Sequence, residues 1–173
     1  MRIACESAVF WIVVAGILAG CSSENRSCTA VGCGPAFTLH APYAGEYEAL
    51  RSASFEFCQN SVCLGGPAQL PEAPSDTFGV GFALTTDPAA PEAGPFGTVT
   101  VWRREDATID LDFQWWPGSV DDIAAGDRYR VTATSPGGER VLSFEESVAE
   151  YAVSYPNGEQ CGPRCQSAQV IAE

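Results

Sequence analysis

Cysteines are the residues whose types and spacing most clearly indicate chemistry. Eight are present, and apart from Cys5 and Cys21 they fall into close pairs: Cys28 with Cys33, Cys58 with Cys63, and Cys161 with Cys165. Paired thiols in an oxidising compartment predict disulfides, and we favour one bond within each pair, although other connectivities are open. Zinc held by two of the pairs is the alternative, but the spacing within them is wider than is usual for zinc ligands. The sequence therefore predicts local disulfides, with no metal and no cofactor.

Acidic residues are the second group of candidate ligands. Asp110 and Asp112 alternate along a predicted strand, and Asp121, Asp122 and Asp127 follow. Carboxylates suit calcium, but this spacing matches no calcium-loop pattern, and Asp-x-Asp on the outer face of a strand is usually only solvated. Paired carboxylates also catalyse glycoside hydrolysis, yet no acidic pair lies in a segment that the sequence marks as a cleft. A hydrolase with paired carboxylates is therefore only an alternative.

The single histidine, His40, is the one candidate base for nucleophilic catalysis of the serine-histidine-aspartate type. It lies in the stretch at residues 21–42 that we expect to be a tether, so we interpret it as an ordinary polar residue. No glycine-rich phosphate loop connects a strand to a helix, which leaves nucleotide binding without support. We therefore predict that the protein is not an enzyme.

Tryptophan side chains give the strongest indication of a binding surface. Trp115 and Trp116 are adjacent on a predicted strand, so their indoles point to opposite faces and both cannot belong to one core. An exposed indole can stack on a sugar ring or anchor a protein partner, and Trp102 is expected on the same outer face as Trp116. The alternative is that Trp116 packs under the loop at residues 121–125. Trp102, Trp115 and Trp116 are the binding-surface candidates.

The N-terminal residues resemble the signal peptide of bacterial lipoproteins. An apolar run at residues 8–19 ends in Leu18-Ala19-Gly20-Cys21, which matches the lipobox of that family at every position. The run is shorter than the roughly 20 apolar residues that cross a bilayer, which argues against a retained helix. The resemblance implies cleavage before Cys21 and acylation of its thiol, which would anchor the protein to membrane lipid. It places the protein in the cell envelope on the extracytoplasmic side, and Ser22 favours the outer membrane.

The composition predicts one folded domain after the signal peptide. Hydrophobic residues make up 46% of the chain and charged residues 18%, which excludes a disordered polyampholyte. Acidic residues outnumber basic ones by 22 to 9, and the formal net charge of −13 argues against nucleic acid as a partner. We expect a signal peptide at residues 1–20, a flexible tether at 21–42 and a β-sandwich domain at 43–173.

Apolar residues alternate with small or polar ones through most of that domain, which is typical of β-strands. Strands are expected at residues 37–40, 52–57, 78–84, 97–104, 108–116, 126–131, 147–155 and 168–171, with another around Leu142 and Phe144. No helix is expected beyond the signal peptide.

The residue pattern also predicts the register of one hairpin. An odd loop at residues 105–107 sets Val99 opposite Phe113, whereas an even loop would set that valine against Asp112. The odd loop is therefore expected.

The stretch Gly126-Asp127-Arg128-Tyr129-Arg130-Val131 resembles the start of a late strand in immunoglobulin-like and fibronectin-type-III-like sandwiches. This resemblance implies an all-β, immunoglobulin-like β-sandwich of about 7–9 strands, with the Tyr129 hydroxyl bonded to nearby backbone. A four-residue turn after it would set Leu142 opposite Val131. The chain is also similar to uncharacterised lipoproteins that end in Y-P-N-G-x-x-C-x-P-x-C, here Tyr155 to Cys165.

Together these patterns predict a membrane-anchored envelope lipoprotein with a non-catalytic domain that binds or scaffolds an envelope protein or glycan. The sequence does not identify the ligand. The alternatives are a carbohydrate-binding module that uses the exposed tryptophans and an envelope hydrolase that uses paired carboxylates.

Overall fold

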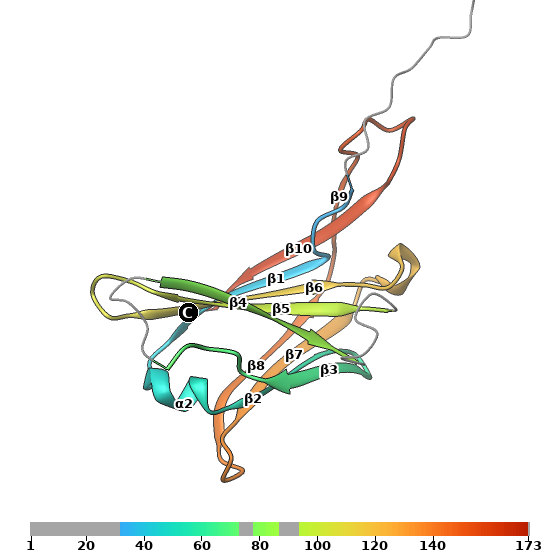
Figure 1. Cartoon of the computed structure of the whole chain (residues 1–173). Helices are drawn as coiled ribbons and strands as arrows, with labels where there is room; N and C mark the ends of the chain where they lie inside the picture. Colours follow the sequence, from blue (N-terminus) through green and yellow to red (C-terminus); the bar gives the residue numbers. More distant parts are fainter. Residues whose placement is uncertain (1–31, 73–77, 87–93, 173) are drawn as a thin grey trace, which may run out of the picture. The chain divides into compact units, whose positions relative to one another are not determined.

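The computed structural model describes residues 32–72, 78–86 and 94–172, which form a mostly-β domain (Figure 1). Its ten strands form one mixed sheet in the order β8-β7-β2-β3-β4-β5-β6-β1-β10-β9. Neighbouring strands run antiparallel except β1 and β10, which are parallel. The strands are β1 (Phe37–Tyr43), β2 (Ser54–Gln59), β3 (Val62–Pro67), β4 (Phe78–Thr85), β5 (Phe96–Arg103), β6 (Ile109–Trp116), β7 (Asp127–Thr134), β8 (Arg140–Val148), β9 (Ala152–Ser154) and β10 (Cys165–Ile171).

The predicted all-β class is confirmed only as a mostly-β fold, and the division into the two sheets of a sandwich is not shown. An immunoglobulin-like sandwich distributes its strands between separate sheets, but strand pairing here runs unbroken from β8 to β9. The junction between β3 and β4 is the narrowest, with one register pair, Gly65 with Thr85. The structure therefore supports a single open sheet.

Aromatic side chains from distant strands of this sheet meet in the core. Phe37 of β1 stacks on Tyr129 of β7, with ring centroids 3.9 Å apart. Phe57 of β2 contacts Trp115 of β6 edge to face, with centroids 5.1 Å apart. Because β2 and β7 lie several strands away from β6 and β1 in the sheet order, these contacts require the sheet to fold back on itself. The core lies between those two parts of the sheet.

The pairing of β5 with β6 follows the register that the residue pattern predicts. Val99 lies opposite Phe113, and both side chains are fully buried. The even-numbered residues of these strands, such as Asp112, therefore lie on the outer face of the sheet and are only partly buried. This outer face carries the candidate site.

The folded domain begins earlier than the predicted boundary at residue 43. Strand β1 pairs with β6 on one side and β10 on the other, and Phe37, Leu39 and Ala41 are buried in the core. The short strand predicted at residues 37–40 is therefore a longer, internal strand, and residues 37–42 do not belong to a tether. The predicted signal peptide, including Cys21, lies outside the described residues.

The hairpin of β7 and β8 has a different register from the one predicted. Val131 pairs with Phe144, and Leu142 pairs with Ala133. The register shifts beside Thr134, and Val141 has no partner there, which is a β-bulge. A shift of two residues keeps each side chain on its predicted face, so the burial of Val131 and Leu142 is unchanged by the error.

Two short helices were missed by the sequence pattern. Helix α2 (Tyr47–Arg51) buries Leu50 completely, and the 3-10 helix η1 (Val120–Asp122) lies between β6 and β7. Helices of three to five residues are too short to show a helical period. In the described part of the chain, no helix has the length and apolar character needed to span a membrane.

Two of the three predicted disulfide pairings are wrong. Cys58 is bonded to Cys63 as predicted, but Cys33 is bonded to Cys165, across 132 residues. Cys161 also forms a disulfide, so its partner is not Cys165. The parallel pairing of β10 with β1 brings Cys165 beside the residues that precede β1, a contact that sequence spacing cannot reveal. Cys28 lies outside the described residues.

Candidate functional site

A groove of about 1130 Å³ lies on the outer face over β1, β4, β5 and β6. Two cross-strand rows of residues form its floor. Gly79, Trp102, Asp110 and Pro42 make one row, and the second includes Asp112, His40 and Ile171. Because these residues are aligned across adjacent strands, their side chains converge on one surface. The groove therefore joins side chains that lie far apart in the sequence.

Trp102 is the most exposed aromatic side chain of this groove, with 46% of its surface accessible. Its indole covers Gly79 on the neighbouring strand, since a methyl group at that glycine would lie 2.2 Å from the six-membered ring. The indole Nε1–H donates to Asp112 Oδ2 over 2.9 Å. A glycine beneath the ring and a hydrogen bond at its edge thus hold an exposed aromatic plane in place.

Charged side chains surround this plane. Asp112 also accepts a hydrogen bond from His40 Nδ1, and Arg104 Nε donates to Asp110 Oδ2. The hydrogen bond to Asp110, together with the negative charge of that carboxylate, raises the pKa of Arg104 above its ordinary value. Each of these groups is partly exposed and retains hydrogen-bonding capacity for a ligand.

The described part of the groove offers hydrogen-bond donors and acceptors, but no alcohol or thiol nucleophile. His40 and Asp112 form the base-orienting half of a catalytic triad, an arrangement that the sequence did not predict. The register of β1 against β6 creates it by setting His40 opposite Asp112. Among the described residues that line the groove, none is a serine, threonine or cysteine that this pair could activate. The side chains of the groove can both donate hydrogen bonds to a polar ligand and accept them from it.

The other tryptophan candidates are placed differently. Trp115 is completely buried in the core, so it is not part of a binding surface. Its Nε1–H has no hydrogen-bond partner among the described residues. Trp116 lies on the outer face, as predicted, but its ring stacks on Phe96 with centroids 4.8 Å apart. Phe96 and Trp102 are six residues apart on β5, roughly 20 Å along a strand, so Trp116 does not belong to the groove.

The aspartates considered for calcium are not brought together. Asp110 and Asp112 line the groove, whereas Asp121 and Asp122 belong to η1. Asp127 is buried at the start of β7. No group of aspartates in the described residues has the mutual proximity of a metal site.

Asp127 instead organises a buried hydrogen-bond network. Its carboxylate accepts from Gln59, Asn60, Tyr151 and the N–H of Ala124 at 2.8–3.0 Å. Burial alone would raise the pKa of Asp127, but these hydrogen bonds outweigh it, and the pKa is lowered. The network ties the β2–β3 turn to the start of β7.

Tyr129 does not form the corner implied by the immunoglobulin-like resemblance. Its hydroxyl shares a 2.8 Å hydrogen bond with Tyr151, not with nearby backbone. Burial raises the pKa of Tyr129 to about 12, so the hydroxyl stays protonated at neutral pH. The residue therefore belongs to the network around Asp127.

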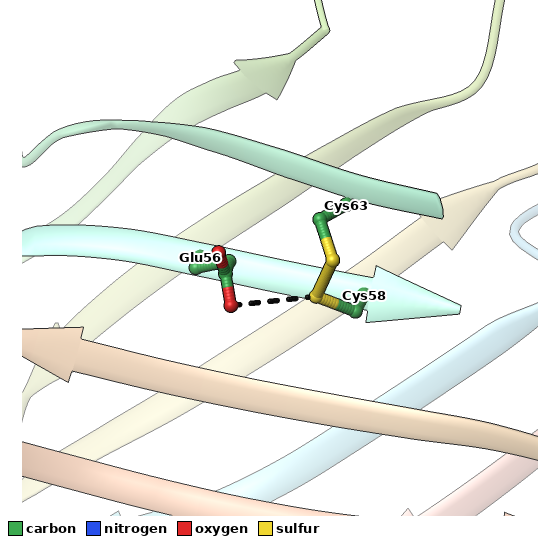
Figure 2. Close-up of side chains that lie close together, drawn as sticks. All are labelled: Glu56, Cys58 and Cys63. Atoms are coloured by element: carbon green, nitrogen blue, oxygen red, sulfur yellow. Dashed lines mark hydrogen bonds between the residues drawn. A yellow bond between two sulfur atoms is a disulfide. The ribbon is translucent and has the colours of Figure 1, made fainter. Parts of the chain in front are cut away.

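Glu56, Cys58 and Cys63 bring a carboxylate and two sulfurs within 4.8 Å of one another (Figure 2). The sulfurs are bonded to each other, so they cannot act as thiolate ligands of a metal in this state. Arg130 Nη2 lies 3.3 Å from Glu56 Oε1 and 3.4 Å from Cys58 Sγ. The cluster is therefore a disulfide beside a paired cation and anion.

The disulfides indicate a domain that folds outside the cytoplasm, where thiols are oxidised. The described residues form a mostly-β domain with one ten-stranded mixed sheet. Comparisons with models of protein families, with curated proteins and with solved structures found no match.

Proposed function

We propose that this protein is a lipid-anchored, non-catalytic binding protein of the cell envelope whose groove at Trp102 binds carbohydrate. The observation that carries the proposal is the exposed Trp102 indole, which lies over Gly79 and is held at its edge by Asp112. This geometry presents a flat apolar plane beside hydrogen-bonding groups.

A sugar ring has the complementary chemistry. One face of a pyranose carries C–H bonds that pack on an aromatic plane, and its rim carries hydroxyl groups. Asp110 and Asp112 provide acceptors for those hydroxyls, and Arg104 and His40 provide donors. Such a mixture of one apolar plane with a few converging polar groups is typical of small-molecule sites.

Support for the anchor comes from a different part of the chain. The sequence Leu18-Ala19-Gly20-Cys21 resembles a lipobox, and the disulfides agree with export. An immunoglobulin-like sandwich belongs to the same proposal, and the ring contacts of Phe37 with Tyr129 and of Phe57 with Trp115 support the face-to-face packing of strands that a sandwich requires. Acyl chains on Cys21 would hold the groove close to the glycans of the envelope.

The experiment is a titration of the detergent-solubilised full-length protein with neutral and acidic glycan fragments, followed by intrinsic tryptophan fluorescence and calorimetry. We expect saturable binding by at least one glycan class. Trp102→Ala should weaken it about 5- to 30-fold, because stacking contributes roughly 1–2 kcal/mol. Binding that is unchanged in Trp102→Ala, or no binding by any glycan, would contradict the proposal.

A further inference from the structure

We propose that the Cys58–Cys63 disulfide is a thiol–disulfide exchange site, opened by an external dithiol that attacks Cys63 and releases Cys58 as a thiolate beside Arg130. This site lies on β2 and β3, apart from the groove at Trp102. The proposal therefore stands independently of the carbohydrate-binding function.

The two described disulfides have different structural roles. Cys33–Cys165 closes a sequence separation of 132 residues and ties β10 to the segment before β1. Cys58–Cys63 closes a separation of only five, between residues that already face each other in the β2–β3 hairpin. In the chain-entropy model a shorter closed loop contributes less to stability. Opening the hairpin bond should therefore leave the fold intact.

Backbone pairing supports the same conclusion. The hairpin is held by register pairs from Ser54–Pro67 to Gln59–Val62, and β2 is also paired with β7 along its length. The strands keep the two cysteines opposite each other when the sulfur–sulfur bond is broken. The dithiol form is therefore placed to close again.

The two sulfurs differ in their surroundings. Cys58 is 1% exposed, whereas Cys63 lines a surface hollow of about 400 Å³ together with Glu56, Gly65 and Thr132. An attacking thiolate must approach in line with the bond that breaks, from the accessible side. Cys63 is therefore the sulfur attacked, and Cys58 is the leaving group.

Arg130 provides the charge that a leaving thiolate requires. Its Nη2 lies 3.4 Å from Cys58 Sγ, and a cation at this distance favours the thiolate over the thiol. Glu56 Oε1 lies 3.3 Å from the same guanidinium nitrogen and 3.5 Å from Cys58 Sγ, so in this position it competes for the cation and opposes a thiolate. Both charged side chains are about half exposed, which lets Glu56 turn away as the thiolate forms.

The exchange needs no reactant other than the dithiol. A dithiol substrate, as one thiolate, attacks Cys63 Sγ; the Cys58–Cys63 bond breaks, and its electron pair remains on Cys58. The second thiol of the substrate loses its proton and attacks the mixed disulfide, which releases Cys63 as a thiolate that takes up a proton. The protein is reduced by two electrons and the dithiol becomes a disulfide. The reverse sequence restores the original bond.

The test follows disulfide reduction in the full-length protein under native conditions, with dithiothreitol as the dithiol. Thiols are alkylated at intervals and located by peptide mass spectrometry, while circular dichroism monitors the fold. Cys58 and Cys63 should become alkylated before Cys33 and Cys165, without loss of the β-sheet signal. Trapping with excess monothiol should place the mixed disulfide on Cys63.

Arg130→Gln should slow the first exchange about three- to tenfold, because it removes the cation beside the leaving sulfur. Arg128→Gln is the matched control, since Arg128 lies two residues earlier on the same face of β7. Its rate should equal that of the unchanged protein. Equal rates for the two variants, reduction of Cys58–Cys63 only together with Cys33–Cys165, or a mixed disulfide on Cys58 would overturn the proposal.

Discussion

Gly79 determines how Trp102 presents its ring. The indole occupies the space that a side chain at this position would need, and Asp112 holds its edge. A residue without a Cβ is therefore required by the geometry of the site rather than by the backbone conformation of β4. Gly79 is a positioning residue in the proposed groove.

Gly79→Ala should displace the indole of Trp102 and weaken glycan binding about five- to tenfold, while the fold is retained. Gly81→Ala is the matched control on the same strand and face, because a methyl group there would meet Thr100 Oγ1 at 3.3 Å and not the indole. Calorimetric titration of both variants is the measurement. Equal affinities in the two variants would show that the position of the indole is not important.

Asp127 makes the stability of the domain sensitive to acid. Its folded-state pKa is lowered by hydrogen bonds, so the carboxylate stabilises the native state fully above its unfolded pKa of about 3.9 and loses that contribution as the pH falls through the folded pKa. Asp127→Asn should lower the free energy of unfolding by about 1–3 kcal/mol at pH 7.

The same variant should lose less stability than the unchanged protein between pH 5 and pH 2, because the titrating group is gone. Urea unfolding at several pH values measures both effects. If the free energies of unfolding of the two proteins differ by the same amount over this whole range, the ionised Asp127 carboxylate is not the source of the acid sensitivity.

At the scale of elements, the sequence predicted best those strands that alternate apolar and polar residues and pair with a strand that alternates in the same way. In β5 and β6, alternation fixes which residues face the core and leaves one loop parity for the hairpin. Strand β3 shows no such pattern, because Gly65, Gly66 and Pro67 take up half of it. It is recognised only through its pairing with β2.

In the candidate site, too, some features follow from the local residue pattern and others depend on how the strands pair. Trp102 was predicted on the outer face from the alternation of β5 alone. The meeting of His40 with Asp112 depends on the position of β1 between β6 and β10, which local pattern does not determine. The same topology brings Cys165 beside Cys33, so these two residues form a disulfide in place of the predicted local pairs.

The Cys33–Cys165 bond ties β10 to the segment preceding β1. Replacing both cysteines by serine should lower the free energy of unfolding by about 3–5 kcal/mol, because the loop that the bond closes is long. Replacing Cys58 and Cys63 by serine should lower the free energy of unfolding by about 2 kcal/mol, because the loop that this bond closes is short. Denaturant unfolding of the two double variants gives the comparison, and a larger loss for the hairpin pair would contradict these roles.

At the scale of the whole molecule, one curved sheet produces both a core and a recognition surface. The odd-numbered residues of β5, β6 and β1 pack against β2 and β7, which leaves their even-numbered residues on the outer face. In the structure, Trp102, Asp112 and His40 are already joined by hydrogen bonds. A preformed site of this kind avoids the entropy cost of ordering its side chains on binding.

The measurement that most directly tests carbohydrate binding at Trp102 is the NMR signal of its indole Nε1–H in the ¹⁵N-labelled full-length protein. Trp102→Phe identifies the signal by its loss. Adding the glycan that binds best should shift this signal progressively to saturation, while the signals of Trp115 and Trp116 stay in place, since one indole is buried and the other stacks on Phe96 outside the groove. A Trp102 signal that does not move at saturating glycan, or a shift confined to Trp116, would contradict the account.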